Sequence, residues 1–242
     1  MNFSEIRKIS IDSITSDKEG CGVLSNLNWK RYERQLNEIS KIIPKNSKIL
    51  EIGCGRGMIT AMIKKINPSS EVTGIDLQRF SSWDVYQKYN DVKYFVGDAT
   101  DLKFKDEEFD AIISFGVVEH VVSDQKFIKE NLRVLKSGGV GFILNIPNKY
   151  SINEFLAQKI GIWSHEVKYN HPNIEALLKS NDITNFVIKR RFLIPAQICR
   201  VNNLLGKIFD KFYLQLDIFD RLVCISPLNL FAQVFDVFYK KS

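Results

Sequence analysis

The sequence predicts an α/β protein whose β-sheet is mostly parallel and is covered by helices on both faces. Short apolar runs, each the length of a buried strand, alternate with segments whose apolar residues recur at helical spacing. The first run, 49–52, leads directly into a turn containing Gly53, Gly55 and Gly57, and a helical pattern follows over 58–66. A strand, a glycine turn and a helix in this order bring the backbone close to a nucleotide-type ligand.

The remaining elements of this core follow in regular order. We expect further strands over residues 71–77, 92–96, 108–115 and 140–144. We expect helices near residues 57–67, 82–89, 124–136 and 172–180. This alternation of strand and helix predicts a parallel sheet between two helical layers. After the fifth strand, residues 145–151 have the Pro and Asn content of a loop.

An amphipathic helix is expected over residues 29–43, ahead of the first strand. Its apolar stripe comprises Trp29, Tyr32, Leu36, Ile39 and Ile43. Asn28 is a candidate N-cap, and Pro44 ends the helical pattern. We expect this helix to pack on the sheet or to cover the ligand.

Length and composition predict one domain with at most a small appendage. The chain has 242 residues, of which 45% are hydrophobic, enough for a single core. We find no apolar leader and no run long enough to span a bilayer. The four cysteines lack metal-binding or redox spacing and predict free thiols in a reducing, cytoplasmic setting: Cys21, Cys54, Cys199 and Cys224.

The positive charge of the chain is concentrated near its C-terminal end. The net charge is +6 overall, which by itself does not predict nucleic-acid binding. Residues 186–242 contain nine Lys or Arg, four Asp and no Glu, a net charge of +5. The same segment holds ten of the 28 aromatic residues. A local basic and aromatic surface is therefore expected there.

The spacing of the glycines and the next acidic residue indicates the kind of ligand. Dinucleotide folds that bind a pyrophosphate use G-x-G-x-x-G, whereas this turn reads G-x-G-x-G. Asp76 ends the second strand, 19 residues after Gly57, the distance expected for a carboxylate that binds both ribose hydroxyls. Asp98 follows the third strand in the sequence Gly97-Asp98-Ala99-Thr100.

Together these motifs, over roughly residues 44–195, resemble the class I S-adenosylmethionine-dependent methyltransferases, and residues 165–178 resemble the small-molecule, ubiquinone-biosynthesis-like branch. The resemblance implies a Rossmann-like fold with seven strands. It places strand six at 185–194 and strand seven at 232–239, antiparallel between strands five and six, with an extra helix before it. The implied divisions of the single methyltransferase domain are an N-terminal helical extension, 1–43, a cofactor-binding core, 44–195, and a helical insertion, 196–231.

The resemblance also implies S-adenosyl-L-methionine as the cofactor and assigns residues to its methionine part. Gly53, Cys54 and Gly55 would place backbone groups against it. Glu51 would orient the amino group, because a carboxylate within an apolar strand needs a partner. Arg56 is a candidate for the methionine carboxylate, or equally an exposed residue at a helix start.

The nucleoside part of the cofactor would contact a second set of residues. Asp76 would bind the ribose, and Leu77 would pack on the adenine. Asp98 would accept the adenine amino hydrogen, with Ala99 supplying a backbone N–H; alternatively, Asp98 only shapes a turn. Phe115 would lie beside the methyl group at the end of strand four.

Two histidines are candidate catalytic residues, although methyl transfer depends largely on positioning. His120 is a possible general base, but a Glu-His pair at this place often only starts a helix. His165 is a candidate for contact with the acceptor or for accepting its proton, and Asn148, Tyr150 and Tyr169 are candidate acceptor contacts by location. We expect no metal site, because a His165–His171 pair lacks nearby ligand partners in the sequence.

The acceptor is expected to be a small molecule, a glycan or a lipid-linked molecule, methylated on O, N or C. A catalytically silent cofactor-binding module remains an alternative function. An NAD(P)-dependent oxidoreductase or epimerase is disfavoured by the glycine spacing. Nucleic acid is not expected, since Phe115-Gly116-Val117-Val118 stands where enzymes acting on base amino groups carry Asn/Asp-Pro-Pro-Tyr/Phe.

The insertion carries its own apolar pattern over residues 199–223. One face of a single helix is predicted to hold Val201, Leu205, Ile208, Phe212, Leu216, Phe219 and Leu222. Such a face most often packs on a core or forms a homodimer contact. A lid over the acceptor, or peripheral contact with a membrane, are the alternatives. We therefore expect a monomer or a homodimer.

Overall fold

The computed structural model describes residues 1–16, 25–159, 161, 164–195 and 203–242. Its centre is a seven-stranded sheet in the order β3-β2-β1-β4-β5-β7-β6. The strands are β1 (Lys48–Ile52), β2 (Glu71–Asp76), β3 (Val92–Val96), β4 (Phe109–Phe115), β5 (Leu135–Pro147), β6 (Phe186–Arg191) and β7 (Val234–Lys240). β7 runs antiparallel to both of its neighbours, and the other pairs are parallel. The predicted fold class is confirmed.

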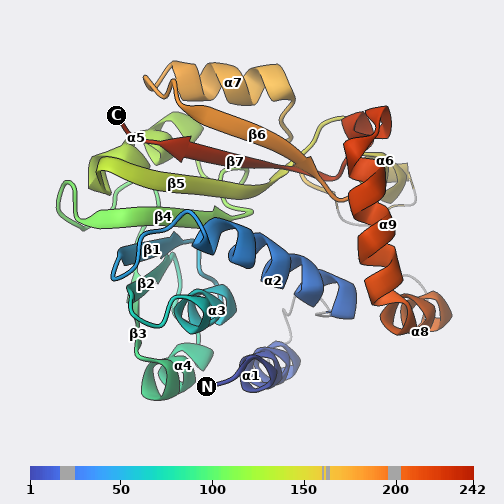
Figure 1. Ribbon diagram of the computed structural model, residues 1–242, viewed down its shortest axis with the longest axis horizontal. Coiled ribbons are helices and arrows are strands. Elements are labelled where there is room, and N and C mark those ends of the chain that lie inside the picture. Colours follow the sequence, from blue (N-terminus) through green and yellow to red (C-terminus); the bar gives the residue numbers. More distant parts are fainter. Residues whose placement is uncertain (17–24, 160, 162–163, 196–202) are drawn as a thin grey trace.

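Helices connect the strands and precede the sheet. They are α1 (Phe3–Ser16), α2 (Asn26–Ser40), α3 (Met58–Ile66), α4 (Ser82–Asn90), α5 (Asp124–Val134), α6 (Ile152–Lys159), α7 (His171–Lys179), α8 (Asn203–Lys211), α9 (Tyr213–Ile225) and a 3-10 helix, η2 (Pro227–Phe231). α1 to α4 lie on one side of the sheet, and α5 and α7 lie on the other (Figure 1). Each side has its own apolar cluster, so the sheet is buried between two layers.

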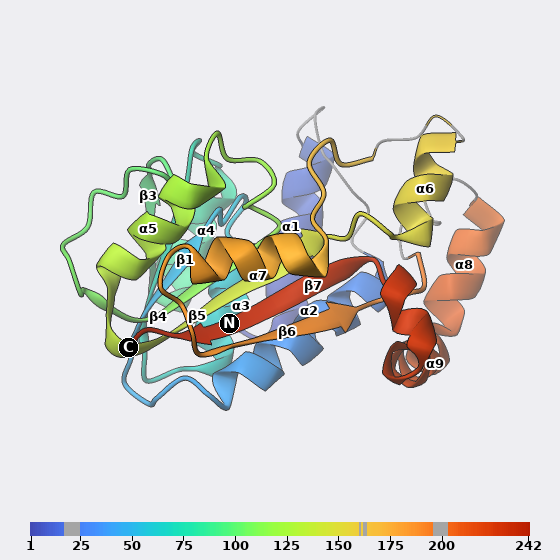
Figure 2. The same ribbon diagram turned by 90° about the horizontal axis from the view of Figure 1, so that it is seen from above.

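The carboxyl ends of the parallel strands set the position of the site. The turns after β1, β2 and β4 meet at one edge of the sheet, as is usual for ligand-binding α/β folds. Beyond the carboxyl ends of β5 and β6, the chain forms α6 and then α8 and α9. These three helices lie together at one end of the molecule, away from α5 and α7 (Figure 2).

Some local predictions needed correction. α2 begins after Ser25, whose side chain accepts a hydrogen bond from the N–H of Asn28, so Ser25 and not Asn28 is the N-cap. β5 continues to Pro147, through part of the predicted loop. Asn145 has φ of 62° at an irregularity in the pairing with β7, and its N–H donates to Asp236. This bond lets the strand continue past a residue typical of loops.

The insertion differs most from its prediction, because it forms two helices that meet at Phe212. Ile208, Phe212, Phe219 and Leu222 are exposed, whereas Asp217 and Asp220 are buried. Val201 and the Leu205 side chain lie outside the described part of the chain. The predicted apolar face therefore points outward, and the buried face of α9 is acidic.

Two arginines of α2 explain this inverted burial. Arg31 pairs with Asp220 at 2.9 Å, and both side chains are at most 4% exposed. Arg34 pairs with Asp217. A buried carboxylate requires a charged partner, and these pairs hold α9 against α2 by its polar face. Hydropathy alone predicts the opposite orientation, because it does not detect partners about 190 residues away.

No helix among the described residues has the length and apolar character needed to cross a bilayer. Cys54 and Cys224 are free thiols, while Cys21 and Cys199 lie outside the described residues.

Candidate active site

The glycine turn after β1 is fastened to the end of β2. The backbone N–H groups of Gly53 and Cys54 donate to the carbonyl of Ile75, at 2.8 and 2.9 Å. The N–H of Gly55 donates to Oδ2 of Asp76 at 2.8 Å. These bonds place the predicted ribose-binding carboxylate directly beside the turn.

The three glycines of the turn have different surroundings. A Cβ on Gly53 would lie 2.3 Å from Cγ2 of Val117, and one on Gly57 would lie 2.7 Å from the Tyr94 ring system. A Cβ on Gly55 meets nothing within 4 Å, although its φ of +49° favours glycine. Protein packing therefore requires two of the glycines, while the third faces open space.

A first cavity of about 270 Å³ opens beside this turn. It contains five of the nine predicted cofactor residues: Gly53, Asp76, Leu77, Asp98 and Ala99. Apolar side chains complete the wall, and two of them, Leu77 and Val122, are 72% and 103% exposed. Two carboxylates together with exposed apolar surface suit a ligand with a polar sugar and a flat apolar ring.

Asp98 is held by its own turn, as the alternative interpretation proposed. Its Oδ1 accepts from the backbone N–H and the hydroxyl of Thr100, at 2.7 and 2.8 Å. These bonds lower the pKa of Asp98. The turn fixes the carboxylate at the cavity wall in its charged form, so the turn role and the ligand role are compatible.

Glu51 and Cys54 lie behind the turn and are absent from the residues lining this cavity. Glu51 is 1% exposed and accepts a hydrogen bond from the Thr60 hydroxyl. Burial raises the pKa of Glu51 to about 8. Burial also raises the pKa of Cys54. The structure excludes a solvated strand end for Glu51, and its role toward a methionine amino group remains a prediction.

Arg56 is half-buried and not exposed, and its contact with a methionine carboxylate remains a prediction. Its guanidinium donates to the carbonyl of Ser13 in α1 at 3.0 Å and lies over the Phe80 ring. This residue therefore ties the N-terminal helix to the glycine turn.

A second cavity, of about 240 Å³, adjoins the first. Gly116 and His120 belong to the walls of both. Phe115 lines this second cavity and not the first, with its ring edge-on to Tyr32 of α2. The remaining wall combines polar and aromatic side chains: Asn28, Arg31, Gln35, Glu119, Asn145, Glu154, His165, Phe192, Gln233 and Val234.

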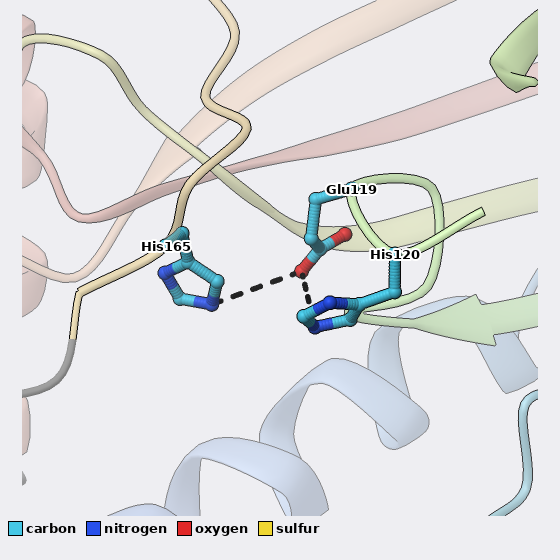
Figure 3. A group of neighbouring side chains, drawn as sticks. All are labelled: Glu119, His120 and His165. Carbon is cyan, nitrogen blue, oxygen red and sulfur yellow. Dashed lines mark ion pairs between the residues drawn. The ribbon is translucent and has the colours of Figure 1, made fainter. Parts of the chain in front are cut away.

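Both predicted catalytic histidines meet at one carboxylate in this wall. Oε1 of Glu119 lies 3.9 Å from Nε2 of His120 and 3.9 Å from Nε2 of His165. Figure 3 shows the Glu119 carboxylate between the two imidazoles. Glu119 and His120 lie on one loop, and His165 lies on a different segment of the chain. Burial raises the pKa of Glu119 to about 7, and burial together with His165 lowers the pKa of His120.

Glu154 of α6 completes this group and was not predicted. Its Oε1 lies 2.8 Å from Nδ1 of His165, and its Oε2 accepts the His165 backbone N–H at 2.9 Å. The bond from His165 lowers the pKa of Glu154 although burial opposes this shift. Glu154 is 11 residues from His165, and no motif connects them in the sequence.

The three other predicted acceptor contacts lie elsewhere, and so does His171, which was considered only as a metal partner of His165. His171 is beside Glu175 and Phe235, not in the group around His165. Tyr169 donates to the carbonyl of Val118, and the buried Asn148 amide donates to the carbonyl of Ala232. Tyr150 is exposed. None of the four belongs to the wall of either cavity described above.

The fold is Rossmann-like, and two adjoining cavities lie at the carboxyl edge of its sheet. Residues 50–143 match the family described as Methyltransferase domain. A ubiquinone biosynthesis O-methyltransferase of Pelagibacter ubique is 36% identical over 42% of this chain and 43% of its own. Another, from Rickettsia typhi, is 29% identical over 77% of this chain and 79% of its own.

A solved S-adenosylmethionine-dependent methyltransferase from Archaeoglobus fulgidus shares the fold. Its TM-score is 0.60 at 15% identity, over 88% of this chain and 94% of that chain. Residues 50–143 therefore match a methyltransferase domain, and the chain is similar to S-adenosylmethionine-dependent methyltransferases, among them enzymes of ubiquinone biosynthesis. This similarity implies S-adenosyl-L-methionine as the cofactor. The matches cover only 40%, 43% and 38% of the length of three curated relatives.

Proposed function

We propose that this protein transfers a methyl group from S-adenosylmethionine in the first cavity to an acceptor in the second. The observation that carries the proposal is the shared wall, in which Gly116 and His120 border both cavities. A donor and an acceptor bound on the two sides of Gly116 would meet there. Holding two reactants in contact supplies much of the acceleration of such a reaction.

The residues of the first cavity fit the proposed cofactor. Asp76 offers a carboxylate to the ribose, Asp98 offers another to the adenine amino group, and Leu77 offers exposed apolar surface to the ring. When bound, S-adenosylmethionine supplies a methyl group on a positively charged sulfur, which keeps the bonding electron pair as the methyl group leaves. Gly55, open above the turn, leaves room for the methionine part.

The second cavity would orient the acceptor and promote the loss of its proton. Arg31 and Gln35 of α2 provide polar contacts, while Tyr32, Phe115 and Phe192 provide flat apolar ones. We infer an acceptor with hydroxyl groups on a planar or apolar body. A hydroxyl acceptor loses its proton at the group formed by Glu119, His120 and His165, which lies where the two cavities meet.

The outward face of α9 supports an acceptor that is lipid-linked. Leu214, Ile218, Leu222 and Ile225 recur at helical spacing and are 46 to 81% exposed. The basic residues Lys207, Lys211 and Arg221 accompany this stripe. An apolar helix face with basic neighbours suits peripheral contact with an anionic bilayer from the cytoplasm. The ubiquinone-biosynthesis names of the relatives agree with such an acceptor.

A label-transfer experiment tests the function. The protein is incubated with S-adenosylmethionine tritiated in its methyl group and, separately, with a lipid extract and an aqueous metabolite extract. We expect tritium in an organic-soluble product, and about tenfold to a hundredfold less of it with Asp76→Asn at a low concentration of S-adenosylmethionine. Cofactor binding without transfer to either extract would indicate the silent module. Binding of NAD(P)H in place of S-adenosylhomocysteine would indicate the oxidoreductase.

A further inference from the structure

We propose that Glu119, His120 and His165 bind a divalent transition-metal ion in the wall of the second cavity. This inference deepens the proposed function, because the ion would hold the acceptor hydroxyl beside the methyl donor. It replaces the expectation from the sequence that the site holds no metal. That expectation considered His165 with His171, whereas the fold brings His165 to Glu119 and His120.

The ligand atoms of these three residues already converge. One atom from each lies within 4.8 Å of the other two, and the two Nε2-to-Oε1 distances are both 3.9 Å. Tetrahedral ligands at about 2.0–2.1 Å from an ion lie roughly 3.4 Å apart. The two contacts to Glu119 therefore need shifts of only a few tenths of an ångström. Figure 3 shows all three side chains directed toward a common point.

Glu154 prepares His165 to act as a ligand. Its carboxylate lies 2.8 Å from Nδ1, so Nδ1 carries the proton and the lone pair of Nε2 faces Glu119. A carboxylate behind a histidine is the usual outer partner of a metal-binding imidazole. The second bond, from the His165 backbone N–H, fixes the position of the residue as well as its ring.

The Glu119 carboxylate supplies an independent indication of a ligand. Its side chain is 1% exposed, and its Oε2 is buried without a hydrogen-bond partner among the described residues. Burying a carboxylate oxygen without a partner costs free energy. A cation bound between Glu119 and the two imidazoles would compensate this buried charge.

The donor set indicates which ions would bind. Two imidazole nitrogens and one carboxylate suit zinc and similar first-row ions, whereas magnesium prefers oxygen ligands. Three protein ligands leave a further position, and here it faces the second cavity. A hydroxyl bound at that position loses its proton more readily, because the cation stabilises the oxyanion. The proton would leave through the open cavity to solvent.

The test measures metal binding directly on the full chain. The purified protein is treated with a chelator, dialysed and titrated with zinc chloride by calorimetry, and the visible absorption of bound Co²⁺ reports its coordination. We expect one equivalent of zinc and no comparable heat from magnesium chloride. Glu119→Gln and His165→Gln should abolish binding, and Glu154→Gln should weaken it by about 10- to 100-fold.

His171→Gln is the matched control, because His171 is a histidine outside the group. It should bind zinc as the wild type does. Thermal unfolding of each variant separates loss of a ligand from loss of the fold. Absence of zinc binding in the wild type, or equal binding in a folded Glu119→Gln variant, would overturn the site.

S-adenosylhomocysteine affinity and label transfer, measured on the same samples, separate this inference from the proposed function. Methyl transfer without zinc binding would overturn the metal site alone. Zinc binding without cofactor affinity would overturn the proposed function alone.

Discussion

Oδ2 of Asp76 accepts a hydrogen bond from the backbone N–H of Gly55 at 2.8 Å, so the acid after β2 and the turn after β1 form one structural unit. The bond fixes the carboxylate at the cavity wall before any ligand arrives. Oδ1 is held less closely, by the Gln78 N–H at 3.3 Å. A ribose would therefore meet an acceptor whose position is already set.

Replacing Asp76 by Asn should weaken S-adenosylhomocysteine binding about tenfold to a hundredfold, or roughly 1.5–3 kcal/mol. The amide oxygen of Asn can still accept from Gly55, so the turn is retained while the charged acceptor for the ribose is lost. Calorimetric titration measures the change. Asp84→Asn, in an exposed pair on α4, is the control and should bind as the wild type does. Wild-type affinity in Asp76→Asn would refute the ribose assignment.

Gly53 and Gly55 should respond differently to substitution by Ala. Gly55→Ala should fold with a loss of about 1–2 kcal/mol from its positive φ, but should fail to bind the cofactor. Gly53→Ala should lose more stability, because its Cβ meets Val117 at 2.3 Å. Thermal unfolding with and without S-adenosylhomocysteine distinguishes the two. An unchanged ligand-induced shift in Gly55→Ala would make that glycine purely structural.

Glu51 should make the stability of the ligand-free protein fall with rising pH. Its folded pKa, about 8, exceeds the ordinary value of 4.5, so the folded state binds an extra proton between these values. The stabilisation is complete below about pH 4.5 and is lost as the pH rises through 8. Between pH 6 and 8.5, the unfolding free energy should fall by roughly 1–3 kcal/mol more in the wild type than in Glu51→Gln. Parallel profiles in urea titrations would contradict this assignment.

Asp220 should be a major contributor to the attachment of α9. It pairs with Arg31, and its Oδ1 accepts from the backbone N–H groups of Leu193 and Ile194. Asp220→Ala leaves a buried guanidinium without its partner, which should cost about 3–5 kcal/mol in urea unfolding. Asp84→Ala breaks an exposed pair and should cost less than about 1 kcal/mol. Equal effects of the two variants would show that the buried pair is not important for stability.

The exposed stripe of α9 should bind anionic liposomes. We expect the wild type to float with such liposomes at low salt, and Phe219→Asp with Leu222→Asp to remain unbound. Each Lys or Arg near the surface contributes about 1 kcal/mol, so salt should weaken binding. Val187→Asp, an exposed position on β6, is the control. If the wild type does not float, and if the wild type is a dimer while the double variant is a monomer, the stripe is a dimer interface.

The sequence was sufficient for the sheet because the strands and the glycine turn are local signals. The strand order, including the antiparallel β7, agrees with the family resemblance. The positions of Asp76 and Asp98 were predictable, since the first ends β2 and the second stands two residues after β3, at the same edge of the sheet. Their positions depend on topology and not on distant partners.

The errors have a common cause in long-range pairing. Asp217 and Asp220 of α9 are buried because they form ion pairs with Arg34 and Arg31 of α2, which is far away in the sequence. Glu154 faces His165 because α6 and the following segment fold together beside Glu119. Neither partner leaves a periodic or motif signal, so only the three-dimensional structure reveals them.

In the proposed arrangement, the donor and acceptor sites meet at Gly116. The most direct measurement is a crystal structure of the protein with S-adenosylhomocysteine. We predict density for the ribose at Asp76, for the adenine against Leu77, and for the sulfur beside Gly116 facing the second cavity. Density for the ligand outside the first cavity, or a sulfur turned away from Gly116 and His120, would show that the two sites do not meet at Gly116.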